Sequence, residues 1–361
     1  MSALRICLIA SSRFPIAEPF AGGLEAHTSA LARALAARGH QVALFAGAAA
    51  EGGDAALPDG VELLRAADFR ASPAARADVS MPAEQWMAEH HAYLQLMLDL
   101  ARTAADRFDI IHNNTLHHLP VAMAGAVPVP IVTTLHTPPT PWLESALRFA
   151  AASARFVAVS DYTAAQWRHA VAATVIPNGV DTDFWHAGPG GRDAVWFGRL
   201  VPEKAPHIAI DAARRAGMGM RLAGPVFDRS YFDAEIAPRL DDDIRYVGHL
   251  TSRELVHLIG HSGVTVVTPQ WDEPYGLVAA ESMACGTPVA AFARGGLPER
   301  IAPDAGVLCP AGDVAALAEA MRRALRLDRA RTRAHAVRHC SLDAMVSGYE
   351  DVYAGTRLLA A

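Results

Sequence analysis

Short apolar runs alternate with helical patterns along almost the whole chain, and this alternation restricts the fold more than any other feature. An apolar run at 6–10 is followed by a helical pattern at 23–38, a stop at Gly39 and a second apolar run at 41–46. Continuous apolar runs of this length are typical of strands buried on both faces, and strands joined through helices are parallel. The sequence therefore predicts an α/β protein with parallel sheets.

The apolar runs fall into two series, separated by a glycine-rich stretch at 183–192. A long amphipathic helix is expected at 82–107, within the first series. The first series continues with four further runs, at 110–111, 131–135, 156–159 and 175–176. The second series contains five runs, at 194–197, 221–223, 244–247, 264–268 and 288–292. Two series predict two Rossmann-like domains, each with its own parallel sheet.

The length of 361 residues also favours two domains, since one domain averages about 150 residues. We expect an amino-terminal domain at 1–186 and a carboxyl-terminal domain at 187–340. One more helix, starting at Leu342, is expected in the last segment, 341–361. We expect that helix to pack back on the amino-terminal domain.

The charge balance argues against a nucleic-acid partner. The chain carries 32 Lys and Arg residues against 38 Asp and Glu residues, for a net charge of −6. Domains that bind nucleic acids are usually strongly basic on one face. We therefore expect no nucleic-acid partner.

The four cysteines, Cys7, Cys285, Cys309 and Cys340, are far apart in the sequence and form no CxxC pair. They are therefore expected to be reduced thiols in a cytoplasmic protein. The first apolar run is too short for a signal peptide, and no apolar segment reaches the roughly 20 residues that span a membrane. We expect no transmembrane segment, while peripheral contact with a membrane stays open.

Two glutamates, Glu273 and Glu281, carry the most informative chemistry. Loop-forming residues surround Glu273, and a helix is expected to begin at Leu277, so that Glu281 lies about one turn inside it. The amides of Gly276, Leu277 and Val278 then lack partners within the helix, and the helix dipole adds positive potential, which suits a pyrophosphate. The two carboxylates suit the hydroxyl groups of a sugar and a ribose. This combination predicts a site for a sugar nucleotide.

A second cluster, formed by Gly198, Arg199 and Lys204, follows a predicted strand. The chain turns at the glycine and enters a helix, which brings two cations to the carboxyl edge of the sheet. Arginine can bridge two phosphate oxygens, lysine acts as a point charge, and together they would stabilise a departing nucleoside diphosphate. The alternative is a surface ion-pair cluster with Glu203.

The order of seven short motifs resembles a family-four glycosyltransferase, a retaining enzyme of the Glu-x7-Glu type with the two-Rossmann GT-B architecture. The likeness covers most of the chain. It implies that the domain at 1–186 is the acceptor side, that the domain at 187–340 binds the nucleotide sugar, and that the two face a central cleft. The motifs are 22–27, 159–160, 176–181, 198–204, 224–225, 247–250 and the glutamate pair at 273 and 281. The sequence departs from the family with Tyr275 where Phe is common and Ser282 where Ala is common, and neither change removes a charge.

The resemblance implies that Arg199 and Lys204 hold the donor pyrophosphate, that Glu281 binds the ribose and that Glu273 lies under the donor sugar. His136 matches the family's histidine near that sugar. The other implied donor contacts are Gly22, Gly23, Gly198, Gly224, Pro225, His249, Leu250, Tyr275, Gly276, Leu277 and Val278.

The implied reaction moves a hexosyl-type group, with retention and without a metal or cofactor, from a nucleotide diphosphate sugar. We expect UDP as the nucleotide, with GDP second. The acceptor is expected to be a small molecule, a glycan or a lipid-linked molecule, and the stretch 68–89, with Met81, Trp86 and Met87, is the candidate acceptor surface.

Four other functions were weighed against the transferase. A metal site among His90, His91, His112, His117 and His118 is disfavoured, because the adjacent His117 and His118 are expected to point different ways and no cysteine or carboxylate completes the ligand set. The loop after the first strand has no GxGxxG, which disfavours a nicotinamide enzyme. A nucleotide-sugar epimerase, or a catalytically silent sugar-nucleotide-binding partner, stays an alternative on the same fold.

Overall fold

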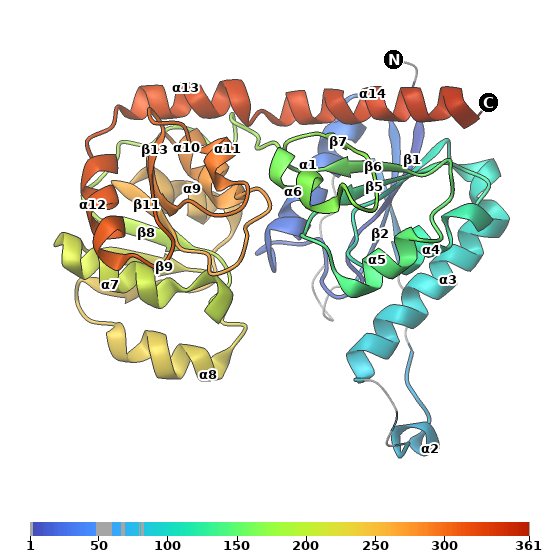
Figure 1. The fold of residues 1–361 in the computed structure, drawn as a ribbon, viewed down its shortest axis with the longest axis horizontal. Helices are drawn as coiled ribbons and strands as arrows, with labels where there is room; N and C mark the ends of the chain where they lie inside the picture. Colours follow the sequence, from blue (N-terminus) through green and yellow to red (C-terminus); the bar gives the residue numbers. More distant parts are fainter. Residues whose placement is uncertain (1–2, 48–59, 66–68, 79, 81–82, 361) are drawn as a thin grey trace.

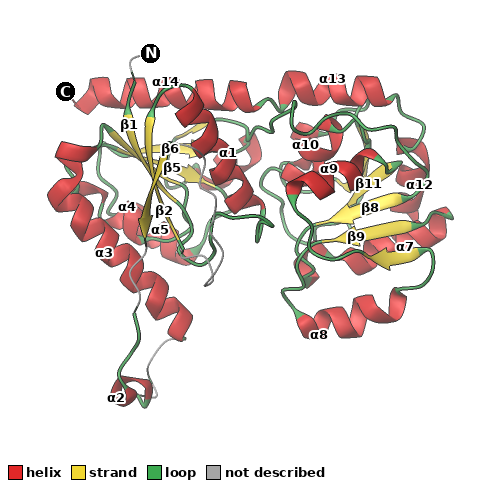
Figure 2. Ribbon diagram, turned by 180° about the vertical axis from the view of Figure 1, so that it is seen from behind, coloured by secondary structure: helices red, strands yellow, loops and turns green. Residues whose placement is uncertain are grey.

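The computed structural model describes residues 3–47, 60–65, 69–78, 80 and 83–360, and it contains two α/β domains that lie side by side (Figures 1 and 2). Each domain is built around one parallel sheet with helices on both faces. The predicted α/β class with two parallel sheets is therefore confirmed.

The first sheet has seven parallel strands in the order β3-β2-β1-β4-β5-β6-β7. Cys7 at its centre pairs with Ala43 on one side and Ile111 on the other. The strands are β1 (Arg5–Ile9), β2 (Gln41–Ala46), β3 (Val61–Arg65), β4 (Ile110–Asn113), β5 (Ile131–Leu135), β6 (Arg155–Ala158) and β7 (Ala173–Val175). The helices of this domain are α1 (Gly23–Ala37), α2 (Pro73–Arg76), α3 (Glu84–Arg107), α4 (Leu119–Ala122), α5 (Pro141–Leu147) and α6 (Asp161–Trp167).

The second sheet has six parallel strands in the order β10-β9-β8-β11-β12-β13. Its strands are β8 (Ala194–Phe197), β9 (Met220–Ala223), β10 (Ile244–Tyr246), β11 (Val264–Val267), β12 (Val289–Phe292) and β13 (Gly306–Cys309). Its helices are α7 (Pro206–Ala216), α8 (Arg229–Tyr231), α9 (Ser252–Gly260), α10 (Leu277–Ala284), α11 (Leu297–Arg300), α12 (Val314–Ala324) and α13 (Arg329–His339). The boundary predicted between residues 186 and 187 falls in the loop between β7 and β8.

The strand order reverses in both sheets at equivalent points, between β1 and β4 in the first and between β8 and β11 in the second. Neighbouring loops leave the carboxyl edge in opposite directions at such a point, which opens a crevice where α/β proteins bind ligands. The topology therefore gives each domain one natural binding edge.

The last helix, α14 (Leu342–Ala360), returns from the second domain to the first and runs along the same side of the molecule as α13 (Figure 1). Its buried Tyr349 and Tyr353 belong to the apolar core that contains the β1 strand. The Tyr353 hydroxyl and the Thr134 hydroxyl bond the two ring nitrogens of His112, at 2.7 and 2.8 Å. Burial lowers the pKa of His112 to about 3. This histidine is thus a neutral part of the core.

Two edge strands, β3 and β13, fall outside the predicted series. Both contain half-exposed residues, so their apolar runs are short and interrupted. No helix in the described part of the chain is long and apolar enough to cross a membrane.

Candidate active site

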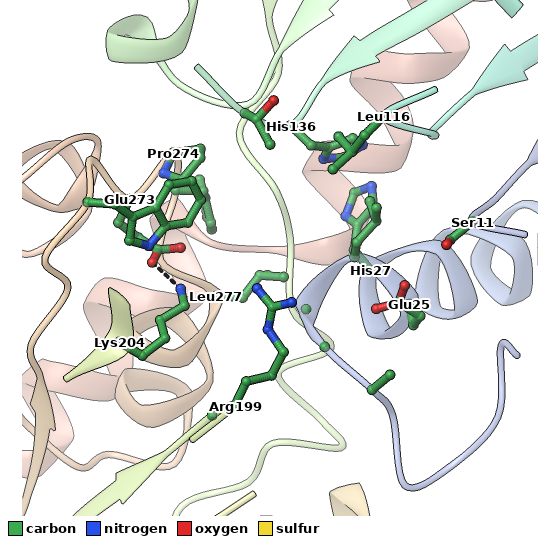
Figure 3. Close-up of a pocket in the computed structure, with 18 of the residues that line it drawn as sticks. Ser11, Glu25, His27, Leu116, His136, Arg199, Lys204, Glu273, Pro274 and Leu277 are labelled. Carbon is green, nitrogen blue, oxygen red and sulfur yellow. Dashed lines mark hydrogen bonds and ion pairs between the residues drawn. The ribbon is translucent and has the colours of Figure 1, made fainter. Parts of the chain in front are cut away.

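A cavity of about 500 Å³ lies between the two domains, at the carboxyl edges of both sheets. Loops that follow β1 and β4 form one side of it, and loops that follow β8 and β11 form the other. These are the two crevices marked by the strand order, facing each other. Figure 3 shows how side chains from both domains converge there.

Lys204 and Glu273 form an ion pair on the carboxyl-terminal side of this cavity (Figure 3). Lys204 ends a short 3-10 turn after β8, while Glu273 lies in the loop after β11. Both side chains are largely buried, with 23% and 15% of their surface exposed. Lys204 is the only lysine in the chain. The pair is therefore a structural feature of the cavity, and the expected alternative of a surface cluster with Glu203 is not what the structure contains.

Arg199 lies beside this pair, and its side chain extends into the same cavity (Figure 3). Its guanidinium contacts the Phe227 ring, 5.7 Å from the ring centroid. Within the described ranges it has no carboxylate within ion-pair distance. Gly198, just before it, has φ +146° and also lines the cavity. An unpaired guanidinium in a cavity is a ready partner for an anion.

The loop that carries Glu273 is held by the two glycines after β12. The Gly296 amide donates to the Glu273 carbonyl at 2.7 Å. Gly295 has φ +61°, and a Cβ there would lie 2.2 Å from the same carbonyl oxygen. Only glycine fits so close to another backbone segment at positive φ. These glycines therefore fix the position of the Glu273 carboxylate.

Contacts from the first domain also hold this loop. The Ser160 hydroxyl donates to the Pro274 carbonyl at 2.6 Å, and the Tyr162 hydroxyl donates to an Asp272 carboxylate oxygen at 2.6 Å. The Tyr162 hydrogen bond, with help from Arg294, lowers the pKa of Asp272. Val159-Ser160 was recognised as a motif, but the importance of Tyr162 and Asp272 was missed, because their contact joins residues 110 positions apart.

The start of helix α10 faces the cavity, as predicted. Gly276 has φ +90°, and a Cβ there would lie 2.4 Å from a Leu297 methyl carbon. The amides of Gly276, Leu277 and Val278 donate no hydrogen bond to any described residue. All three residues line the cavity, together with Tyr275. Free amides at a helix start form an anion site.

Glu281 lies one turn inside α10 and is not among the residues that line the cavity. Burial raises the pKa of its carboxyl to about 8. Its role toward the ribose stays a prediction.

Four of the residues implied as donor contacts also lie outside the cavity lining: Gly224, Pro225, His249 and Leu250. A Cβ on Gly224 would lie 1.8 Å from the Gly198 carbonyl oxygen, so this glycine allows two strand-end turns to meet. The His249 ring is hydrogen-bonded to the Phe20 carbonyl of the first domain at 3.0 Å. Gly224 and His249 therefore support the site, and direct contact of all four residues with a donor stays a prediction.

Gly22 and Gly23, at the start of α1, bring the first domain up to the charged side. A Cβ on Gly22 would lie 3.9 Å from the Arg199 side chain, and one on Gly23 would lie 3.2 Å from a Leu277 methyl carbon. Both glycines line the cavity. Burial raises the pKa of the nearby Glu25 carboxyl.

His136 follows β5 and lines the cavity, as expected. Its Nε2–H donates to the Asn114 side-chain oxygen at 2.9 Å, which leaves Nδ1 as an acceptor. Burial, with smaller effects of His27 and His112, lowers the pKa of His136 well below its usual range. The ring is therefore neutral at physiological pH, so any role in transfer is that of a neutral imidazole.

The expectation that His117 and His118 point different ways is wrong. Ring nitrogens of His90, His117 and His118 all lie within 4.8 Å of one another. The His117 and His118 rings stack with centroids 4.4 Å apart, because the chain turns tightly between β4 and α4. Of the candidate acceptor stretch, Trp86 and Glu89 line the cavity, Met87 does not, and Met81 lies outside the described residues.

Comparison with known proteins identifies the family of this chain. Residues 21–184 match the family described as "Glycosyltransferase Family 4", and residues 187–337 match the family "Glycosyl transferases group 1". A glycogen synthase of Mycobacterium tuberculosis is 30% identical over 342 residues, which cover 84% of this chain and 82% of that protein. The chain belongs to glycosyltransferase family 4. This glycosyltransferase is also 29% identical, over 82% of its chain and 80% of the relative, to a D-inositol 3-phosphate glycosyltransferase of Nocardiopsis dassonvillei.

Solved structures confirm that this glycosyltransferase has the GT-B fold. Anabaena HepE in complex with UDP-glucose superimposes with a TM-score of 0.73 at 18% identity, over 98% of this chain and 100% of that one. The sucrose-phosphate synthase of Thermosynechococcus elongatus superimposes with a TM-score of 0.75 at 21% identity, over 97% and 98% of the two chains. At these identities the likeness concerns the fold alone.

Proposed function

We propose that this glycosyltransferase moves a hexosyl group from a nucleotide diphosphate sugar to an acceptor hydroxyl, with retention at the anomeric carbon. One observation carries the proposal: Arg199, Lys204 and the free amides at the start of α10 face one cavity from the same side. UDP is the favoured nucleotide, because HepE, which shares the fold, binds UDP-glucose, and GDP is second. The acceptor is a small molecule, a glycan or a lipid-linked molecule.

The chemistry follows from where charge develops. As the bond between the anomeric carbon and the diphosphate oxygen breaks, its electron pair goes to the diphosphate, and the sugar becomes oxocarbenium-like. Arg199, Lys204 and the helix amides stabilise that negative charge more strongly than they stabilise the bound donor. These cations are proposed to take the role that a bound metal has in other transferases, with no cofactor.

Retention follows a front-face route in this proposal. The acceptor oxygen forms its bond to the anomeric carbon on the face that the diphosphate leaves, and the acceptor proton passes to a leaving phosphate oxygen. Glu273 orients the sugar hydroxyls and has no covalent role. Neutral His136 offers Nδ1 as an acceptor for one hydroxyl.

The ion pair between Lys204 and Glu273 is compatible with both roles. An ammonium group has three N–H donors, so one can stay on Glu273 while another reaches a phosphate oxygen. The pair then links the leaving group to the sugar through two side chains. Closure of the two domains over the cavity that both of them line would keep water from the donor. We place the reaction in the cytoplasm because the four cysteines are free and buried.

The single lysine makes the proposal directly testable. An amine-reactive reagent modifies only Lys204 and the terminal amino group, so mass spectrometry reports on one side chain of the site. UDP-glucose or GDP-mannose is expected to protect Lys204, whereas UMP, which has no diphosphate, is not. Equal labelling with and without each nucleotide sugar would show that Lys204 does not contact the diphosphate.

The product distinguishes the transferase from its alternatives. NMR of the new glycosidic bond is expected to give the donor's own anomeric configuration. An epimerised sugar from donor alone would identify an epimerase, and donor binding without transfer to any acceptor would identify a silent partner.

A further inference from the structure

Three aromatic side chains form an open wall on the amino-terminal side of the cavity. Trp86, His118 and Trp142 all line it, and they come from α3, the loop after β4 and helix α5. The His118 and Trp142 rings stack with centroids 5.4 Å apart, and the two indoles lie 6.0 Å apart. Trp142 is 60% exposed. A large aromatic surface left open beside a binding cavity favours an apolar ligand face.

Among the described residues, the amino-terminal side of the cavity has no unpaired cation. Among its described lining residues the only arginine or lysine is Arg13, and its guanidinium is paired with Glu89 at 2.8 Å. The stretches outside the described residues contain no Lys, Arg or His. Burial lowers the pKa of His117 to about 3 and also lowers that of His118, so these rings are neutral. A phosphate on this side would have no unpaired positive partner.

We propose that this aromatic wall binds a saccharide ring of the acceptor, and that the ring carries no phosphate. The inference rests on the proposed donor site and names the acceptor class for the same cavity. The C–H face of a pyranose packs on an aromatic ring, while its hydroxyls bond polar groups at the edge, here the Glu89 carboxylate. The wall and the donor side share one cavity, so a bound saccharide lies next to the transferred sugar.

The histidines act in this wall as aromatic surface and not as metal ligands. An imidazole binds a metal through a lone pair that lies in the plane of its ring. The His117 and His118 rings stack with their planes at 26°, so an ion between the two ring faces would lie outside the plane of either ring. In addition, the Leu119 amide donates to Nδ1 of His117 at 3.3 Å, so the neutral ring carries its proton on Nε2.

The test measures saccharide binding in the presence of UDP by saturation-transfer NMR and calorimetry. The probes are maltose, cellobiose and methyl α-mannoside, each compared with glucose 6-phosphate and inositol 1-phosphate. We expect at least one neutral saccharide to bind and both phosphates to bind more weakly. Trp142→Ala is expected to weaken saccharide binding about tenfold without changing UDP binding. The matched control is Phe149→Ala, which removes a 73% exposed ring that does not line the cavity.

A second variant tests the charge argument by removing the carboxylate that pairs with Arg13. Glu89→Gln frees Arg13 and is expected to strengthen binding of the sugar phosphates relative to maltose. Stronger binding of a phosphate than of every neutral saccharide by the parent enzyme would overturn the inference, as would saccharide binding that requires added Zn²⁺ and is lost with EDTA. UDP binding without any neutral saccharide would overturn it while sparing the donor site. Failure to bind both UDP and GDP would overturn the proposed function first and this inference with it.

Discussion

The two sides of the cavity present different kinds of chemical group. The carboxyl-terminal side presents a lysine, an arginine, a glutamate and free backbone amides, while the amino-terminal side presents aromatic rings and neutral histidines. Fixed charges suit a step in which negative charge develops at one place. Open aromatic surface suits a ligand recognised by the shape of its apolar face. The comparison indicates that the donor side is specified by charge and the acceptor side by shape.

The two sides also differ in how they are held. On the charged side, backbone turns at Gly276 and Gly295 have positive φ and leave no space for a Cβ. On the aromatic side, Trp142 is held mainly by contact with other rings. Backbone constraints of the first kind tolerate little change, so substitutions there are expected to have the larger effects.

The largest effect is expected at Lys204. Lys204→Ala removes a cation from the diphosphate and leaves Glu273 as an unpaired carboxylate beside it. We expect kcat/KM for the donor to fall by about a hundredfold to a thousandfold. Steady-state kinetics measures kcat/KM, and calorimetry measures UDP binding. Lys204→Arg, which keeps the charge, is expected to lose less, and parent-like turnover of Lys204→Ala would remove the charged side from the mechanism.

A smaller effect is expected at Gly295. Gly295→Ala forces a methyl group against the Glu273 carbonyl, and we expect it to lower the free energy of unfolding by about 3 kcal/mol and to displace Glu273. The matched control is Gly217→Ala, where φ is +72° and no atom lies within 4 Å of the new Cβ. That change is expected to cost about 1 kcal/mol. Denaturant titrations measure the free energy of unfolding. An equal loss in the two variants would show that backbone strain at positive φ, and not the contact with Glu273, causes the destabilisation.

A still smaller effect is expected where the first domain holds the loop of the charged side. Tyr162→Phe removes the hydroxyl that bonds Asp272, and we expect kcat to fall about tenfold with little change in UDP binding. The control is Tyr231→Phe, which removes a hydrogen bond of the same length, 2.6 Å, to His207 within the second domain. An unchanged kcat in Tyr162→Phe would mean that the Glu273 loop holds its position without the first domain.

The smallest effect concerns the pH dependence of stability at Glu281. Its pKa of about 8 lies above the ordinary value of 4.5, so its contribution to stability is complete below pH 4.5 and is lost as the pH rises through 8. The melting temperature of the parent is expected to fall between pH 6 and pH 9. Glu281→Gln cannot ionise and is expected to reduce this fall by about 3 °C. Calorimetry measures the melting temperatures of the parent and of this variant across the pH range. The control is Glu319→Gln at an exposed position, which should leave the fall in melting temperature the same as in the parent.

Much of the charged side was predictable because its groups lie close to short motifs. Arg199 and Lys204 follow one strand, and Gly276, Leu277 and Val278 begin one helix, so local geometry was enough to bring each set to the sheet edge. The pairing of Lys204 with Glu273 joins residues 69 positions apart and was not predicted. The cavity lining also omits Glu281, which the motif alone would have included.

The aromatic side was largely unpredictable, because its rings come from segments that lie far apart in the chain. Trp86 was recognised as part of a candidate surface, but Trp142 was not. His117 and His118, whose rings stack, were expected to point different ways. These rings belong to three separate segments, and nothing in the spacing within each segment tells how the segments pack.

The sequence by itself determined the α/β class, the two parallel sheets, the helix start at Leu277 and the cations after β8, because each depends on residues near one another in the chain. Tertiary structure alone decided which carboxylate pairs with Lys204, how the first domain holds Asp272 and how three aromatic side chains form one wall. Such contacts depend on how the sheets and helices pack after long loops close, and local patterns of hydrophobicity do not encode those distances.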